Sequence, residues 1–385
     1  MVPQQEIHDI CQSLGVPLVH VEKDYVMAWL LWGISRDPLL RQELILKGGS
    51  ALRKLYFPDT RFSDDLDFTT RHQIGGDSFR DRLGAVQAQV SQASGIPFET
   101  DRTRVEEKPT PDEEAHALDG RVYFRGIAGD SSLTFRIKFD VSPYERIVLP
   151  VQEHKILHGF SDGAECFASV LGYSLEEILA EKLRSWIQRT RARDLFDVVK
   201  IIQSGRLPVS KLNILSVFMQ KTVFKDIPQV GRDELLEPGK FETIRSHWLE
   251  TIICPTNALI VATNAITTFI QFVTALFQPE VLTAIRVGSV PRAGFARRIP
   301  SAIREAIISA GRARHLIRMR YHSHDRTIEP YSLIYRVRKS DGRGFEYFFG
   351  FDQTRGQHMK CFFLHEIQSV SMLPQSFQPR YAVEF

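Results

Sequence analysis

The sequence predicts an α+β fold in two parts, and three patterns in its 385 residues carry this prediction. Residues 131–141 alternate apolar and polar side chains, which is typical of a half-buried strand. Residues 175–186 repeat apolar side chains at the spacing of an amphipathic helix. Beyond residue 315, five short strand-like runs follow one another, separated by turn residues. Helices and strands are thus mixed first, and a small all-β barrel is expected last.

The segment over residues 47–68 carries the strongest indication of chemistry and reads KGGSALRKLYFPDTRFSDDLDF. Gly48 and Gly49 open an expected helix, where free N–H groups and the positive end of the helix dipole suit a phosphate. Asp65 and Asp67 alternate in an expected strand, so their carboxylates share one face. Such a pair is costly without a cation, and Mg²⁺ is the usual one. Singly, a solvated strand and a tight turn explain these features; together they predict phosphoryl or nucleotidyl transfer.

A third carboxylate is expected to join this pair. The strand over residues 131–141 has residues 121–127 as its expected hairpin partner, with the turn at residues 126–130. Asp140 ends the polar face of this strand, which it shares with Lys138. A surface strand with ion pairs would have the same sequence pattern. Beside the other two acids, however, a third acid at a strand end is what two-metal catalysis requires.

Two helices are expected next. Ser174 and Glu177 have the spacing of a capping box, which predicts a helix start. The buried stripe of this helix consists of Leu175, Ile178, Leu179, Leu183 and Trp186. Lys182 lies at the edge of the stripe. The second helix begins near residue 193, where Asp194 or Asp197 would complement the helix dipole; we favour a functional role for Asp194 and a structural one for Asp197.

Basic residues accumulate around these two helices. They are Arg184, Arg189, Arg191, Arg193 and Lys200. Such a run is usually a solvated helix face. Next to a nucleotidyl-transfer site it would also accommodate a polyanionic acceptor, because phosphate neutralisation supplies most nonspecific nucleic-acid affinity. The run therefore favours RNA as a partner.

Four blocks of the sequence belong together. They are EKDY at residues 22–25, RFSDDLDF at 61–68, FRIKFD at 135–140 and SLEEILAEKLRSWIQRTRARDLFD at 174–197. In this order they resemble the AbiEii/AbiGii toxin family of nucleotidyltransferases, which belongs to bacterial abortive-infection (antiviral defence) and toxin–antitoxin systems. The resemblance covers residues 15–275. It implies a polymerase-β-like nucleotidyltransferase core at about residues 20–150 and a helical part at about residues 165–286.

The resemblance also implies a role for each site residue. Asp65, Asp67 and Asp140 would be catalytic and metal-binding; Lys47, Gly48, Gly49, Ser50, Arg61, Lys182 and Asp194 would bind the nucleotide. The implied cofactor is Mg²⁺, as two ions, with Mn²⁺ as a substitute. The implied substrates are a nucleoside triphosphate and RNA, in particular a tRNA 3′ end, and a cognate antitoxin is the implied protein partner. Two alternatives stay open: nucleotidylation of a protein hydroxyl, and a non-catalytic nucleic-acid-binding regulator.

Composition adds weaker constraints. A formal charge of +3 and a pI of about 8.6 are compatible with nucleic acid. The four cysteines lack metal-binding spacing and the N-terminus is polar, so a reducing cytoplasmic location is expected. Residues 251–279 carry no charge, but proline, asparagine and glutamine interrupt them. A buried or partner-facing helix is therefore expected there, and no membrane span.

Two stretches are expected to lack regular structure. Residues 99–119 are acidic and contain prolines without apolar periodicity, which predicts a mobile surface loop. Residues 287–300, VGSVPRAGFARRIP, have the composition of a linker. This linker would separate a first domain at residues 1–286 from a second domain at residues 301–385.

The second domain is expected to begin with a helix at residues 301–310. Its predicted strands are residues 316–321, 327–337, 345–351, 359–363 and 367–372. Residues 326–331, 346–351 and 360–367, with Phe377, resemble a WYL domain, a ligand-sensing Sm/SH3-like barrel. The resemblance implies a ligand pocket with Arg326, Tyr347 and Lys360, although barrel packing and an ion pair would also explain Tyr347 and Arg326. Glu-Tyr-Phe replaces the namesake tripeptide, and Glu366 stands where the family has an arginine.

Overall fold

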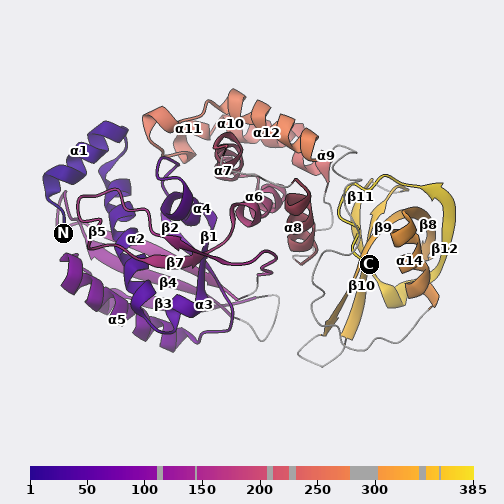
Figure 1. The fold of residues 1–385 in the computed structure, drawn as a ribbon, viewed down its shortest axis with the longest axis horizontal. Helices are drawn as coiled ribbons and strands as arrows, with labels where there is room; N and C mark the ends of the chain where they lie inside the picture. The colour runs from indigo at the N-terminus through magenta and orange to yellow at the C-terminus, as the bar shows by residue number, and fades with distance from the viewer. Residues whose placement is uncertain are drawn as a thin grey trace.

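The computed structural model describes residues 1–110, 116–143, 145–205, 211–224, 231–277, 302–337, 344–354 and 357–385. Within these residues, a seven-stranded sheet with its helices forms one unit and a five-stranded sheet forms another (Figure 1). In this view, the helices within residues 175–276 lie above and between the two sheets. The expected linker at residues 287–300 lies outside the described residues.

The first sheet is mixed. Its strands are β1 (Leu44–Lys47), β2 (Asp65–Thr70), β3 (Arg104–Pro109), β4 (His116–Arg125), β5 (Thr134–Ser142), β6 (Gln152–Lys155) and β7 (Ser169–Gly172). Their order is β3-β4-β5-β2-β1-β7-β6. Strands β2 and β5 are parallel, as are β1 and β7, and the other neighbours are antiparallel. The expected hairpin of residues 121–127 with the strand at 131–141 is confirmed as β4 and β5.

The prediction of a loop over residues 99–119 is wrong for most of that stretch. A short 3₁₀-helix (Thr100–Arg102) leads into β3, which pairs with β4 along its whole length. Strand β3 is largely exposed, because it is the edge of the sheet. Charged side chains are favoured on an edge strand, where they oppose pairing with another chain. The acidic composition that predicted a loop is therefore that of an edge strand.

Four helices accompany the N-terminal half of the sheet: α1 (Gln4–Leu14), α2 (Leu18–Arg36), α3 (Leu40–Glu43) and α5 (Gly76–Ser94). Helix α2 is buried over most of its length and contacts α1, α5, β5 and β7. Helix α5 covers β3 and β4, where Phe79 and Leu83 pack on Gly120. After β1, α4 (Gly48–Ala51) continues into one turn of π-helix (Leu52–Tyr56).

The helical part follows β7. It contains α6 (Leu175–Arg189), α7 (Ala192–Gln203), α8 (Lys211–Phe224), α9 (Arg232–Leu235), α10 (Pro238–Arg245), α11 (Trp248–Thr251), a 3₁₀ turn (Thr256–Ala258) and α12 (Ala262–Leu276). Ser174 caps α6 by accepting a hydrogen bond from the backbone N–H of Glu177, as predicted. The predicted apolar stripe of α6 is buried. The helix expected within residues 251–279 is confirmed for Ala262–Leu276, where Phe269 and Val273 are buried, whereas residues 252–261 contain only a 3₁₀ turn. None of the described helices is long and apolar enough to cross a membrane.

The C-terminal unit combines α14 (Ala302–Ala313) with five strands. They are β8 (His315–Tyr321), β9 (His324–Val337), β10 (Gly344–Asp352), β11 (His358–Phe363) and β12 (Ile367–Ser376), with a 3₁₀ turn (Leu364–Glu366) before the last. All five predicted strands are confirmed. Their order, β11-β10-β9-β8-β12, is that of an antiparallel sheet; closure into an Sm/SH3-like barrel stays a prediction.

The two units share a hydrophobic core. Residues of α9 and α12 belong to the same buried cluster as Phe351, Phe377 and Tyr381 of the C-terminal unit. The rings of Phe277 and Tyr381 lie edge to face with centroids 6.0 Å apart. The C-terminal unit is therefore packed against the helical part through apolar side chains.

A buried ion cluster fixes the π-helix against α2. Asp24 of α2 accepts from Arg53 Nε at 2.7 Å and from Lys54 Nζ at 2.8 Å, and all three side chains are buried. Burial alone would raise the pKa of Asp24, but the two cations outweigh it and lower this pKa to about 2. The ionised carboxylate therefore stabilises the fold.

We predict that Asp24→Ala destabilises the protein by about 3–5 kcal/mol, because two cations are left buried without their counter-charge. Since the folded-state pKa lies below the unfolded one, the stabilisation is present above about pH 4 and is lost as the pH falls towards 2. Urea unfolding across this range measures the effect. A wild-type acid slope that Asp24→Asn leaves unchanged would contradict it.

Candidate active site

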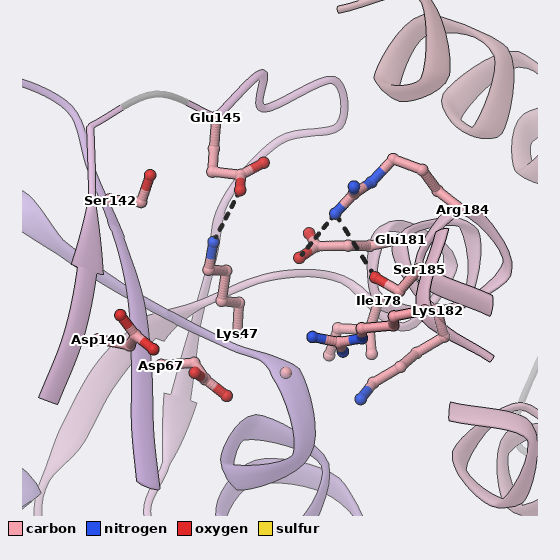
Figure 2. Close-up of a pocket in the computed structure, with 12 residues that line it drawn as sticks. Lys47, Asp67, Asp140, Ser142, Glu145, Ile178, Glu181, Lys182, Arg184 and Ser185 are labelled. Carbon is pink, nitrogen blue, oxygen red and sulfur yellow. Dashed lines mark hydrogen bonds and ion pairs between the residues drawn. The ribbon is translucent and has the colours of Figure 1, made fainter. Parts of the chain in front are cut away.

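A cavity of about 240 Å³ opens between the first sheet and helix α6 (Figure 2). The sheet and the segment after β5 contribute Lys47, Gly48, Asp67, Asp140, Ser142 and Glu145. Helix α6 contributes Ile178, Glu181, Lys182, Arg184, Ser185 and Arg189. Five of the ten residues predicted for catalysis or nucleotide binding therefore line one cavity: Lys47, Gly48, Asp67, Asp140 and Lys182.

Strand register brings the carboxylates together. Asp67 of β2 lies opposite Asp140 of β5 in the parallel ladder, and opposite Lys47 of β1 on its other side. Asp65 lies two residues earlier on the same face of β2, opposite Lys138. Asp67 and Asp140 both line the cavity, whereas Asp65 is not among the lining residues.

The carboxylates of β2 are held with little compensating charge. Burial raises the pKa of Asp67 to about 6; Lys47 and Lys182 oppose this rise, while Asp140 and Asp65 add to it. Burial likewise raises the pKa of Asp65, against the pull of Lys138. A half-buried carboxylate whose ionised form is disfavoured would be stabilised by a cation from outside.

The donor set fits Mg²⁺ in the way this ion is usually bound. Among the described residues, no three His, Cys, Asp or Glu side chains form a ready-made metal site, and Lys138 Nζ lies 2.8 Å from Asp140 Oδ2. Mg²⁺, however, commonly takes only one or two carboxylates and completes its shell with water and substrate phosphates. Asp67 and Asp140, both facing the cavity, satisfy that requirement.

The glycine pair is required by close contacts. Gly48 has a φ of +70°, and a Cβ at this position would lie 2.5 Å from Asp67 Oδ2. A Cβ on Gly49 would collide with the guanidinium of Arg61. The Ser50 hydroxyl donates to the Lys47 carbonyl at 3.2 Å and lies 3.4 Å from the backbone nitrogen of Asp67. Only Gly48 of this trio lines the cavity, and the other two support its wall.

A buried network holds the predicted basic residues. Arg61 donates twice to Asp197, from Nε at 2.8 Å and from Nη2 at 2.7 Å. Lys182 Nζ lies 2.8 Å from Asp197 and 3.1 Å from Asp194, and Arg189 donates twice to Asp194. Burial would raise the pKa of Asp194, but Lys182 and Arg189 lower it well below its ordinary value.

This network separates the predicted nucleotide ligands into two groups. Lys182 reaches the cavity, whereas Arg61 is buried beside it and does not line it. Asp194 also stays behind the wall, where it positions Lys182 and Arg189. Asp197 contacts Arg61 and Lys182 and does not line the cavity.

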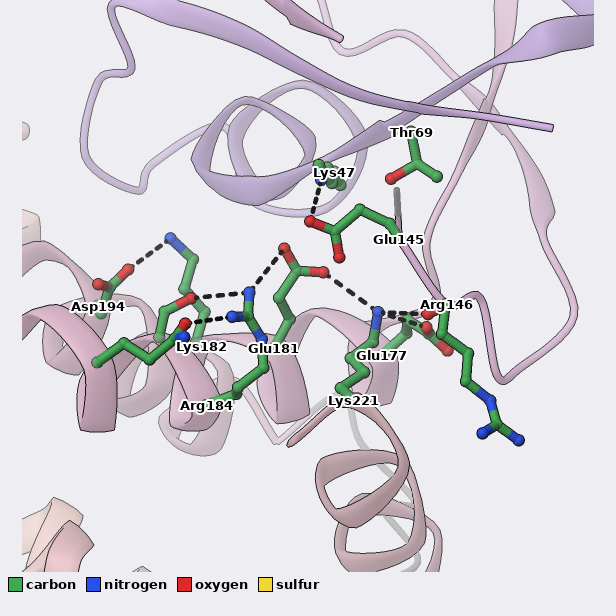
Figure 3. Close-up of polar contacts among 12 residues, drawn as sticks. Lys47, Thr69, Glu145, Arg146, Glu177, Glu181, Lys182, Arg184, Asp194 and Lys221 are labelled. Atoms are coloured by element: carbon green, nitrogen blue, oxygen red, sulfur yellow. Dashed lines mark hydrogen bonds and ion pairs between the residues drawn. The ribbon is translucent and has the colours of Figure 1, made fainter. Parts of the chain in front are cut away.

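Sequence reasoning missed several cavity residues. Glu145 pairs with Lys47 at 3.3 Å, and Glu181 pairs with Lys221 of α8 at 3.3 Å (Figure 3). Glu181, Ser185 and Arg189 follow one another at intervals of four residues and so share one face of α6, which means that the helical period contained a signal for them. Glu145 follows β5 in an irregular segment, and no periodic signal pointed to it.

Comparison with known proteins gives one family match. The family described as nucleotidyl transferase AbiEii toxin, type IV TA system, matches residues 29–252. Among solved structures, the nucleotidyltransferase toxin MenT4 of Mycobacterium tuberculosis H37Rv is 15% identical with a TM-score of 0.43; the similarity covers 74% of this chain and 91% of that chain. The proteasome accessory factor B/C of Arthrobacter aurescens is 12% identical with a TM-score of 0.20, covering 93% and 71%. No curated protein matches the chain.

The matched residues include the carboxylates of β2 and β5, the cavity-lining helix α6 and the acidic start of α7. They end before the C-terminal unit, so the WYL resemblance stays a prediction. The match extends over more than half of the chain and confirms the resemblance that the four sequence blocks indicated. The chain therefore belongs to the AbiEii family of nucleotidyltransferase toxins from type IV toxin–antitoxin systems.

Proposed function

We propose that this nucleotidyltransferase uses Mg²⁺ to transfer a nucleotide from a nucleoside triphosphate to an RNA hydroxyl, in particular a tRNA 3′ end. Blocked translation in the bacterial cytoplasm would then serve toxicity or phage defence, under the control of an antitoxin. The observation that carries the proposal is the charge arrangement of the cavity. Two carboxylates, Asp67 and Asp140, form one wall, and Lys182 belongs to the opposite wall (Figure 2). A second cation of helix α6, Arg189, also lines the cavity.

The sheet wall would hold the metal. Asp67 and Asp140, which line the cavity, would be its ligands, and Asp65 on the same face of β2 would be a third candidate. When bound, Mg²⁺ would neutralise phosphate charge and align the triphosphate for in-line displacement. One or two ions could bind, with Mn²⁺ as a substitute for Mg²⁺. Their positive charge would offset the effect of burial, which raises the pKa of Asp67.

The opposite wall would hold the triphosphate. Lys182 and Arg189 are kept in place by Asp194, so their charges are already oriented before a nucleotide binds. The backbone at Gly48 approaches Asp67 closely, which leaves room for phosphate oxygens only because residue 48 has no side chain. Gly49 and Ser50 would act by shaping this turn.

The transfer itself needs a base for the acceptor hydroxyl. Asp140 is the most exposed of the three carboxylates, with 52% of its side chain accessible, and can therefore meet a large acceptor. The hydroxyl oxygen would form a bond to the α-phosphorus, the bond from this phosphorus to the bridging oxygen would break, and pyrophosphate would leave. The hydroxyl proton would pass to Asp140. Lys138, whose Nζ lies 2.8 Å from Asp140 Oδ2, would hold this carboxylate in position.

Basic side chains near the cavity support an RNA acceptor. Arg189 lines the cavity, Arg191 is exposed at the start of α7, and Arg193 is close enough to Asp65 to oppose the rise in its pKa. Arg136 is exposed on the same face of β5 as Asp140. By contrast, Lys200 is paired with Asp59 at 2.6 Å. The cations near the cavity would contact acceptor phosphates.

We also propose that the C-terminal unit senses a ligand. Arg326 and Lys360 both contact the buried carboxylate of Asp352, at 2.6 and 2.9 Å, and Tyr347 packs against Phe363. These contacts favour packing and an ion cluster over an open pocket. A ligand would have to compete with Asp352 for the two cations.

Transfer should require Asp67, Asp140 and a divalent metal. With labelled nucleoside triphosphates, Mg²⁺ and total RNA, the protein should label RNA; Asp67→Asn and Asp140→Asn should each slow labelling by about a hundredfold or more. A chelator should abolish it and Mn²⁺ restore it. Asp77→Asn, an exposed acid on α5, is the matched control. Label in protein in place of RNA, or none with any nucleotide, would contradict the proposal.

We predict that the ionised carboxylate of Asp67 destabilises the metal-free protein. Because the folded-state pKa of Asp67 lies above its unfolded value, stability falls as the pH rises from about 4 to 6 and stays lower above it. Asp67→Asn should therefore stabilise the metal-free protein by about 1–3 kcal/mol at neutral pH and less at pH 4. Urea unfolding with and without Mg²⁺ tests this. If Asp67→Asn and the wild type had equal free energies of unfolding at both pH values, burial would not destabilise the ionised carboxylate, and the prediction would be wrong.

A further inference from the structure

The cavity has two electrostatically different parts. In the part described above, the carboxylates of Asp67 and Asp140 line the cavity together with Lys182 and Arg189. The other part contains ion pairs that are already formed: Lys47 with Glu145 at 3.3 Å, and Glu181 with Lys221 at 3.3 Å and with Arg184 at 3.9 Å. Figure 2 shows these two pairs facing each other, with Lys47 and Glu145 on the sheet side and Glu181 and Arg184 on α6.

This second part is polar and nearly neutral. Glu181 turns towards α8, where Lys221 holds it, while Lys182 turns towards α7. The ion pairs leave no strong net charge to attract a phosphate, and Ser142, Ile178 and Ser185 complete the lining. Hydrogen-bonding groups beside an apolar side chain suit an uncharged ring with polar edges. In a nucleoside triphosphate, that ring is the base.

Arg184 has an unused hydrogen-bond donor in this part of the cavity. The residue is only 7% exposed, and its buried Nε has no hydrogen-bond partner among the described residues. Its Nη1 donates to Gln188 and its Nη2 contacts the Ser185 hydroxyl at 3.5 Å, so the guanidinium plane is held in place. Leaving a buried charged donor unpaired is costly, which points to an acceptor supplied by a ligand.

We infer that Arg184 and Glu181 recognise the base of the bound nucleoside triphosphate, Arg184 by donating to a carbonyl oxygen and Glu181 by accepting from a neighbouring N–H. The inference rests on the proposed function for the presence of the triphosphate. Guanine and uracil each have a carbonyl oxygen beside a ring N–H group. Cytosine has a carbonyl oxygen, but a ring nitrogen without hydrogen separates it from the amino group, and adenine has no carbonyl oxygen. Arg184 is therefore a specificity-determining residue that disfavours ATP.

Binding measurements test this without turnover. The full-length protein is titrated in Mg²⁺ with GTP, CTP, UTP, ATP and, as a base-free ligand, inorganic tripolyphosphate. ATP should bind at least about tenfold more weakly than the tightest of the other three. In Arg184→Gln, that tightest nucleotide should lose about tenfold in affinity, and ATP and tripolyphosphate should change less than about twofold.

Three further variants make the result specific. Arg184→Lys keeps the charge and much of the packing but lacks the planar guanidinium, so it should lose base preference like Arg184→Gln, and it serves if that variant does not fold. Arg189→Gln should weaken all five ligands alike, because Arg189 belongs to the phosphate end. Arg245→Gln, an exposed arginine on α10 paired with Glu242, should change none.

The outcomes separate the inference from the proposed function. Tightest binding of ATP, or an unchanged ranking in both Arg184 variants, would overturn the inference while the transfer reaction stood. A loss of tripolyphosphate binding equal to the loss of nucleotide binding would place Arg184 on the phosphates and overturn it too. Failure of the wild type to bind any triphosphate would overturn both.

Discussion

A buried ion pair between Arg61 and Asp197 joins the two walls of the active-site cavity. Arg61 precedes β2, which carries two of the catalytic candidates, and Asp197 belongs to α7 in the helical part. Both side chains are almost fully buried, and the pair is bidentate, so its geometry is restrictive. Removing either partner would leave the other charge uncompensated in the interior. The relative position of β2 and α6 therefore depends on this contact.

The same pair explains sequence features on both sides. Gly49 packs against the guanidinium of Arg61, so no side chain fits at residue 49. Lys182 lies between Asp197 and Asp194, which places its charge on the cavity wall. Signature residues that first suggested direct nucleotide contact thus fall into two kinds. Some reach the cavity, and others hold those residues in position.

The sequence predicted local structure well and the site in part. The alternation of apolar and polar side chains predicted β2 and β5, because a half-buried strand requires that pattern. The same alternation predicted that Asp65 and Asp67 lie on one face of β2. It did not predict β3, whose charged edge has no apolar periodicity, nor the contact of Arg61 with Asp197, which lie far apart in the chain. Glu145 and Arg184 were also not predicted for the cavity. Their placement depends on how the segment after β5 faces α6, and this is a tertiary arrangement without a local signal.

The buried acids of the chain show why the cavity is the functional part. Asp24, Asp194 and Asp197 each contact two basic side chains, and the pKa of each is lowered although burial opposes it. Asp67 forms no ion pair among the described residues, and burial raises its pKa. A fold able to neutralise three buried carboxylates has left this one without a partner, at a cost in stability. Such a local conflict is expected where a site is built for a group that the chain does not itself supply, and a cation with its bound triphosphate is the group that this charge pattern would accept.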